Sequence, residues 1–124
     1  MNRVLLISLG AAAGANARYW IGVWALQRIG PRFPYGTFFV NVTGSLILGF
    51  LVALAAERML PEPWRLLLAV GFCGSYTTFS SYAVESVDLF SGGVPWLPWL
   101  NVIGNNLLAL LAVLGGIWLA RALR

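Results

Sequence analysis

Long apolar stretches separated by short polar connections dominate the pattern of this chain. Apart from Arg18, no charged residue lies between positions 4 and 27, and further uncharged stretches cover 33–56, 66–84 and 89–120. An α-helix needs about 20 apolar residues to cross a bilayer. The pattern therefore predicts an all-α integral membrane protein with four transmembrane helices, near residues 3–26, 36–57, 64–90 and 97–121.

The connections between these stretches are short and rich in turn residues. Gly and Pro mark the first and third, at 30–34 and 91–95, and two Pro mark the second, at 61–63. They leave no room for a soluble domain, so residues 1–124 are expected to form a single membrane domain. The first apolar stretch continues well past its small residues at 11–13, which favours a spanning helix over a cleaved signal peptide.

Composition and charge agree with a multi-pass membrane protein, and the membrane in which we expect it is the cell inner (plasma) membrane. The chain is 60% hydrophobic and 10% charged, and polar residues this scarce cannot cover a water-soluble domain. The net charge is +4, and all eight basic residues are Arg. We interpret these Arg residues as flanking the membrane spans rather than as a nucleic-acid-binding surface. Five Arg on the side of the termini against two opposite favour termini inside, but insertion in both orientations stays open.

The residues that membrane catalysis would need are scarce. The chain has no His, the single Cys73 and four carboxylates, which excludes an intrachain disulfide and leaves no credible transition-metal site. Glu85 and Asp88, three positions apart near the end of the third stretch, are also explained as interfacial or solvated charges. The protein is therefore not expected to be an enzyme.

A hydroxyl-rich run interrupts the third apolar stretch. Seven of the nine residues from Gly74 to Tyr82 carry a hydroxyl, whereas helix packing would explain only single Ser or Thr residues. Gly71 and Gly74 precede the run, and the pattern predicts that the helix breaks near 74–78. At mid-membrane depth such a break requires burial in protein or a watery cavity, and its freed carbonyls can hold a small cation.

The other polar residues of the spans favour an anion as the transported ion. Amides at Asn41 and at 101, 105 and 106 supply donors, and no carboxylate lies deep in a span. Arg18 lies in the first span, where it either faces the pathway or extends to the interface. Phe79 and Tyr82 share one helical face; their ring edges carry positive potential, although packing alone also explains such a pair.

The small size of the chain predicts an oligomer. Four helices pack into one bundle without space for a lined aqueous path, so two or more copies are expected. Small-residue seams for close helix approach lie at 10–14, at Gly44 and Gly49, and at Gly115 and Gly116.

These motifs together resemble the Fluc/CrcB family of fluoride channels. GFCGSYTTFSSYAVES at 71–86 is similar to the family's third-helix signature, with a Gly-rich lead, a Thr-Thr-Phe-Ser core, a second aromatic three residues later and a Glu. GAAAGANARYW at 10–20 and PYGTFFVNVTGSLILGF at 34–50 resemble its first-helix and second-helix patterns. The likeness covers the whole chain.

The resemblance implies an antiparallel, dual-topology homodimer that conducts fluoride out of the cytoplasm, with fluoride, lipid and a second copy as its partners. It implies two narrow anion paths and a structural Na⁺ at the dimer centre, held by backbone carbonyls of Gly74 and Thr77. The side chains that it assigns to the anion pathway are Phe79, Tyr82, Asn41, Ser80, Ser81, Arg18 and Glu85. Tyr82 stands where the family commonly has Phe, and Asn105 and Asn106 stand where Ser or Thr is frequent.

Two other functions stay open at this point. A small dimeric multidrug transporter would need a membrane-embedded carboxylate, usually in the first helix, where this chain has Arg18. A non-transporting membrane assembly subunit would conduct no ion and would tolerate removal of the polar run.

Overall fold

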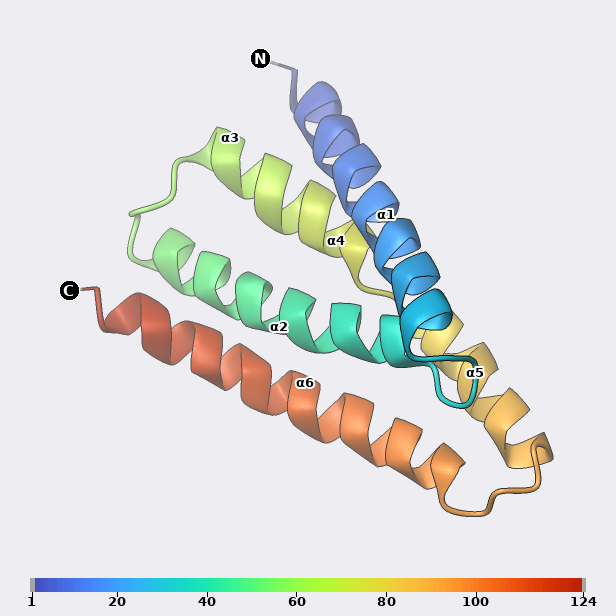
Figure 1. Cartoon of the computed structure of the whole chain (residues 1–124). Coiled ribbons are helices and arrows are strands. Elements are labelled where there is room, and N and C mark those ends of the chain that lie inside the picture. Colours follow the sequence, from blue (N-terminus) through green and yellow to red (C-terminus); the bar gives the residue numbers. More distant parts are fainter. Residues whose placement is uncertain (1, 124) are drawn as a thin grey trace.

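The computed structural model describes residues 2–123, and every regular element in that range is helical. Three long helices are α1 (Arg3–Arg28), α2 (Tyr35–Ala56) and α6 (Leu97–Arg121) (Figure 1). Each is long and apolar enough to cross a membrane. The predicted all-α multi-pass architecture is therefore confirmed, and the bounds of these helices differ from the prediction by at most two residues.

The third predicted span is divided into several shorter elements. It comprises α3 (Glu62–Trp64), the π-helix η1 (Arg65–Cys73), α4 (Gly74–Tyr76) and α5 (Phe79–Ser91). π-Helices are rare and are frequently found at functional sites. The chain thus leaves regular α-geometry twice, in η1 before the hydroxyl-rich run and at Thr77 and Thr78 within it.

Local sequence explains where the long helices begin and end. The Asn2 side chain caps α1 by accepting the Val4 N–H at 2.9 Å. Gly30 follows this helix at φ 111°, a conformation that glycine adopts without strain. Pro34 precedes α2 and Pro98 lies in the first turn of α6, where a missing N–H breaks no helical bond.

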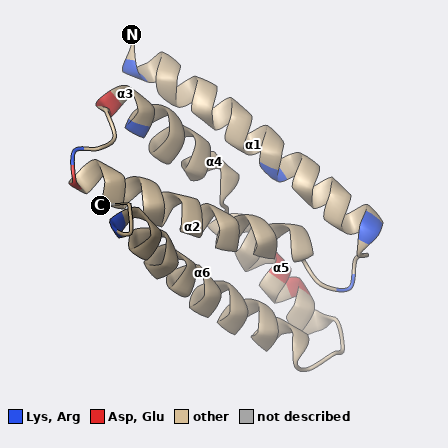
Figure 2. Cartoon of the chain, turned by 60° about the vertical axis from the view of Figure 1, so that its left-hand side comes forward, with Lys and Arg blue, Asp and Glu red and all other residues tan. Residues whose placement is uncertain are grey.

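Two helix pairs make up most of the packing. α2 lies along α6, and α1 lies along η1 (Figure 1). An ion pair of 2.9 Å between Arg3 and Glu62 joins the start of α1 to α3, and charged residues concentrate near the helix ends and connections (Figure 2). The N-terminal end of α1 and the α2–α3 connection therefore lie at one end of the bundle.

The predicted small-residue seams join helices within this one chain. A Cβ added at Gly10 or Gly14 would collide with the backbone of η1, and one at Gly116 with the backbone of α2. Both helix pairs thus approach so closely that backbone touches backbone.

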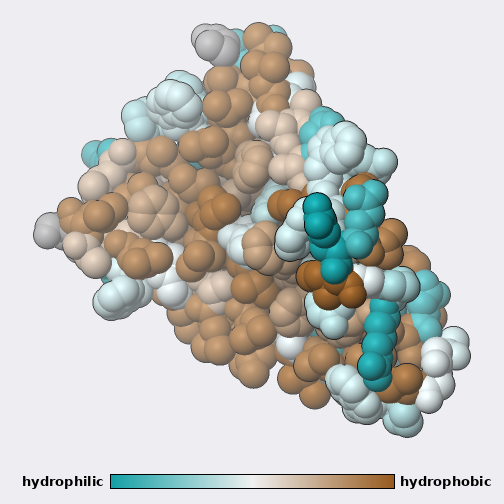
Figure 3. Space-filling model, in the orientation of Figure 1, coloured by the Kyte–Doolittle hydropathy of each residue, from teal (hydrophilic) through white to brown (hydrophobic). Residues whose placement is uncertain are grey.

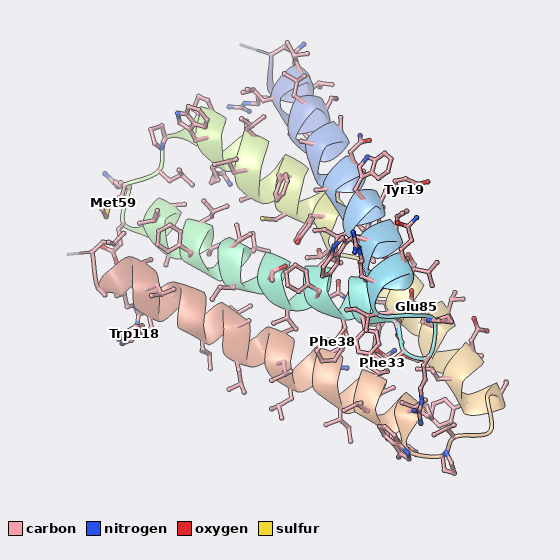
Figure 4. All side chains as sticks on the ribbon, viewed as in Figure 1. Tyr19, Phe33, Phe38, Met59, Glu85 and Trp118 are labelled. Atoms are coloured by element: carbon pink, nitrogen blue, oxygen red, sulfur yellow. The ribbon has the colours of Figure 1, made fainter. Side chains whose placement is uncertain are left out.

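The outer surface of the bundle is strongly apolar. Leu110 on α6 is 66% exposed and Trp118 is 68% exposed, and brown surface covers most of the face in Figure 3, with hydrophilic atoms gathered over the α1–α2 connection and α5. The labelled Tyr19 and Trp118 side chains point away from the helices (Figure 4). Such a surface requires lipid or another apolar partner.

Candidate functional site

The backbone between α4 and α5 is extended for two residues. Thr77 has φ −82° and ψ 157°, and Thr78 has φ −150° and ψ 119°. The Thr78 hydroxyl caps α5 by accepting the Ser81 N–H at 3.2 Å. The hydroxyl-rich run therefore surrounds the point where one helix ends and the next begins.

The Asn41 side chain on α2 makes two hydrogen bonds with the backbone of Thr78. Its Oδ1 accepts the Thr78 N–H at 2.8 Å, and its Nδ2 donates to the Thr78 carbonyl at 3.1 Å. Buried backbone groups need such partners because leaving them unpaired is costly. Asn41 thus replaces the helical hydrogen bonds that the extended backbone gives up.

This arrangement leaves the carbonyls of Gly74 and Thr77 without their usual helical donors. In a continuous α-helix the N–H of residue 78 donates to the carbonyl of Gly74, and that of residue 81 to the carbonyl of Thr77. Here the first N–H donates to Asn41 and the second to the Thr78 hydroxyl. The two carbonyls are the ones for which the sequence resemblance implies a cation-binding role.

Three more side chains continue from Asn41 into the packing between α5 and α6. Asn105 accepts from Asn41 Nδ2 at 3.1 Å and donates to Asn101 Oδ1 at 2.8 Å. Asn101 Nδ2 donates to the Ser86 hydroxyl at 3.0 Å, and that hydroxyl donates to the Tyr82 carbonyl at 2.7 Å. A continuous hydrogen-bonded chain therefore connects α6 with the extended pair.

A cavity of about 280 Å³ opens beside the extended pair. The predicted residues Asn41, Thr77, Phe79 and Tyr82 line it, together with Asn105 and Asn106. The rings of Phe79 and Tyr82 lie 5.3 Å apart at 55°, which confirms that they share a face. Tyr82 is buried, whereas Phe79 is 77% exposed and presents its ring at the surface of this chain.

The remaining predicted pathway residues lie outside this cavity. The Ser80 hydroxyl and the Ser81 backbone N–H both hydrogen-bond the Thr78 hydroxyl, at 3.3 and 3.2 Å. Arg18, on α1, lines neither this cavity nor the larger one near the α1–α2 connection. The structure therefore does not bring it to the aromatic pair.

Glu85 belongs to that larger cavity of about 630 Å³, which Asp88 also lines. Its Oε1 accepts a hydrogen bond from the Thr37 hydroxyl at 2.8 Å, so α5 is joined to α2 there. Its Oε2 is buried and has no hydrogen-bond partner among the described residues. Figure 4 shows Glu85 close to the connection that carries Phe33.

Several residues of this site could not be assigned from the sequence. Thr78 was one hydroxyl among seven, and only the fold shows that it meets Asn41 from a distance of 37 positions. Thr37 and Ser86 carried no signal beyond being polar residues of an apolar span. The amides at 101, 105 and 106 were recognised as donors, but nothing in their spacing indicated their partners.

The geometry offers a small cation oxygen ligands without charge. The carbonyls of Gly74 and Thr77 are released as described, and a Cβ added at Gly74 would have no neighbour within 4 Å, so space is open there. No group of three His, Cys, Asp or Glu side chains that could hold a metal occurs within residues 2–123. Backbone carbonyls suit an alkali cation such as Na⁺.

Comparison with known proteins gives consistent matches along nearly the whole chain. The family model described as "CrcB-like protein, Camphor Resistance (CrcB)" matches residues 5–117. A Chloroflexus aurantiacus protein named "Fluoride-specific ion channel FluC" is 48% identical over 123 residues, covering 98% of this chain and 97% of its own. Proteins of the same name from Koribacter versatilis and Rhizobium meliloti are 48% and 41% identical, and the matches cover at least 95% of both chains in each pair.

Proposed function

This chain belongs to the CrcB-like protein family, and from that premise we propose that it is a fluoride-selective channel for passive efflux of fluoride from the cytoplasm. The proposal rests on one observation of the site. The helix interruption, clamped by Asn41, lies beside a cavity lined by the aromatic pair and by hydroxyl and amide groups. The names of the relatives supply the identity of the ion.

Fluoride is small and strongly hydrated, so a pore must replace its water with close donors. A narrow path lined by ring edges and hydroxyls would admit it and penalise the larger chloride. Phe79 presents its ring at the surface of the cavity, and Tyr82 lies next to it. Ser80 and Ser81 extend the polar line along α5, and Arg18 and Glu85 act nearer the mouths of the path.

The Tyr82 hydroxyl offers a hydrogen-bond donor to the cavity, whereas the amides of Asn41 and Asn106 do not. Both hydrogens of the Asn41 amide are engaged, by Thr78 and by Asn105. Those of Asn106 are engaged by the Val102 carbonyl and the Tyr82 hydroxyl oxygen. The Tyr82 hydroxyl accepts from Asn106 and keeps its own hydrogen for an anion, a donor that Phe cannot supply.

A sodium ion held by the carbonyls of Gly74 and Thr77 fits the released backbone at the interruption. When bound, it supplies a fixed positive charge that attracts anions toward the cavity. The protein contributes Asn41, which holds the Thr78 N–H away from the Gly74 carbonyl. This arrangement needs no acidic ligand at the centre.

An antiparallel homodimer with dual topology completes the proposal. Two observations support a second copy at this face: the single chain leaves Phe79 77% exposed, and it leaves the space around Gly74 open. The antiparallel orientation is taken from the family resemblance. A second copy covers that face and supplies its own carbonyls. The dimer lies in the cell inner membrane, where fluoride that enters as HF and ionises in the cytoplasm can leave again.

Fluoride efflux from liposomes tests the proposal. The purified protein is reconstituted with a potassium ionophore, and a fluoride electrode follows release, with a parallel chloride run. We expect fast fluoride release with little chloride. We also expect Phe79→Ile to abolish this release and leave the dimer intact on size-exclusion chromatography.

Phe90→Ile is the matched control, because Phe90 is also exposed on α5 but lines neither cavity. It should keep the wild-type rate. Wild-type flux in Phe79→Ile would remove that ring from the path, and no fluoride release from a folded wild-type dimer would overturn the proposed function itself.

A further inference from the structure

We propose that Asn101, which lines neither cavity, is a positioning residue that orients the Asn41 amide on the helix interruption. It acts through Asn105, and Ser86 fixes the direction of the whole chain of bonds. We name these four side chains, Ser86, Asn101, Asn105 and Asn41, the amide relay. The inference rests on the proposed function for its relevance to ion conduction, but its structural content stands on hydrogen bonds alone.

The direction of the relay is determined first at Ser86. The Ser86 hydroxyl has one hydrogen, which it donates to the Tyr82 carbonyl at 2.7 Å. It can therefore only accept from Asn101, which must present Nδ2, at 3.0 Å. Asn101 Oδ1 then faces Asn105, which must present its own Nδ2, at 2.8 Å.

The other end of the relay imposes the same direction independently. The Thr78 backbone has a fixed donor and a fixed acceptor, so Asn41 must turn Oδ1 to the N–H and Nδ2 to the carbonyl. The second hydrogen of Asn41 Nδ2 then reaches Asn105 Oδ1 at 3.1 Å. The orientations imposed from Ser86 and from Thr78 are therefore compatible at the Asn105 amide. Turning any one amide by 180° would place a donor opposite a donor or an acceptor opposite an acceptor.

Burial makes the direction of these hydrogen bonds costly to reverse. Asn101 is 0% exposed and Asn105 5%, and Ser86 and Thr78 are each 7% exposed. Water therefore has little access to replace a lost partner, and an unpaired buried amide is costly. Asn105 is held further by a second bond, from its Nδ2 to the Asn101 carbonyl at 3.0 Å.

The consequence is that a residue on α6 controls backbone on the third segment. With the relay intact, the Thr78 N–H stays on Asn41 and away from the Gly74 carbonyl. Without the Asn101 side chain, Asn105 Nδ2 keeps only the Asn101 backbone carbonyl as its acceptor. The Asn105 amide is then held less firmly and gives weaker support to the Asn41 amide on Thr78. The interruption would loosen although no cavity residue had changed.

Selective labelling makes this measurable without any ion flux. The threonines of the chain are Thr37, Thr43, Thr77 and Thr78, so ¹⁵N-threonine labelling of the detergent-solubilised full chain gives few amide signals. We expect Asn101→Leu to shift the Thr78 amide signal and to raise its hydrogen-exchange rate on the order of tenfold. The signals of Thr37 and Thr43, on α2 outside the relay, should stay in place.

Asn106→Leu is the matched control, because its amide donates to Tyr82 and Val102 rather than to the relay. It should leave Thr78 exchange at the wild-type rate. Asn41→Leu should raise that rate by itself, and adding Asn101→Leu to it should have no further effect, because the residue acts through Asn41.

The outcomes are decisive for the relay. Unchanged Thr78 exchange in Asn101→Leu, or full additivity with Asn41→Leu, would overturn it. If Asn101→Leu fails to fold, Ser86→Ala can take its place, because it removes only the end of the relay that is remote from Thr78. Ser86→Ala should still raise the Thr78 amide exchange rate, and an unchanged rate would overturn the relay. Failure of fluoride efflux in the wild type, with these exchange results intact, would overturn the proposed function and leave the relay standing.

Discussion

Replacing Gly116 by Ala tests the close packing of α6 on α2. A Cβ at this position would lie 2.7 Å from the Phe50 amide nitrogen and 3.2 Å from the Gly49 carbonyl carbon, and nearer still to the Leu46 carbonyl oxygen. Ordinary contacts between heavy atoms are about 3.5–4.0 Å, so the two backbones would have to separate by roughly 1 Å. Overpacking of this kind costs about 1–3 kcal/mol.

The neighbouring Gly115 provides the matched control. A Cβ there would meet only the Leu46 Cδ1 atom at 3.5 Å, which is ordinary contact. Ala in a helix interior is favoured over Gly by up to about 1 kcal/mol, so Gly115→Ala should be neutral or slightly stabilising. We therefore expect the free energy of unfolding of Gly116→Ala to be lower than that of Gly115→Ala by roughly 2 kcal/mol or more.

Titration with SDS in mixed micelles, followed by far-UV circular dichroism, measures this difference. The two variants add the same methyl group one position apart, so effects of composition cancel. Equal unfolding midpoints would refute the reasoning, because they would mean that the helices do not approach as closely as the structure indicates.

Three further predictions concern conduction. Asn41→Leu should slow fluoride efflux at least tenfold, about the effect of unpairing a buried backbone group at Thr78; a wild-type rate would limit Asn41 to packing. Tyr82→Phe removes a hydroxyl that keeps its hydrogen free for an anion and should lower fluoride efflux about threefold to tenfold. Tyr76→Phe should not lower efflux, because the Tyr76 hydroxyl bonds Thr43; equal rates in both variants would exclude the Tyr82 hydroxyl as a donor. Preparing the protein in N-methylglucamine buffer without Na⁺ should abolish fluoride efflux, because N-methylglucamine is too large to replace Na⁺ between backbone carbonyls. Adding Na⁺ back should restore efflux, and undiminished efflux without Na⁺ would contradict a requirement for sodium.

Much of the candidate site could be predicted as a set of residues but not as a set of contacts. The density of hydroxyls at 74–82 marked the third segment, and the family motifs marked Asn41, Phe79 and Tyr82. The fold then placed these three around one cavity. Arg18 does not line that cavity. Its position in the sequence gives its depth along α1, but not which neighbouring helix its side chain faces.

The sequence by itself determined the class of protein and the bounds of its three unbroken long helices to within two residues. Apolar length and the spacing of charges are local properties, and lipid requires that every backbone group in a span be paired within the protein. The same requirement explains why an interruption needs polar side chains nearby, which the composition of the run already indicates.

Only the tertiary structure decided which side chain meets which backbone group. Asn41 and Thr78 lie 37 positions apart, and Asn41 and Asn105 lie 64 apart. Their meeting depends on the way α2 packs between the third segment and α6. The direction of each hydrogen bond in the amide relay follows from donors and acceptors that packing brings face to face, and no local pattern carries that information.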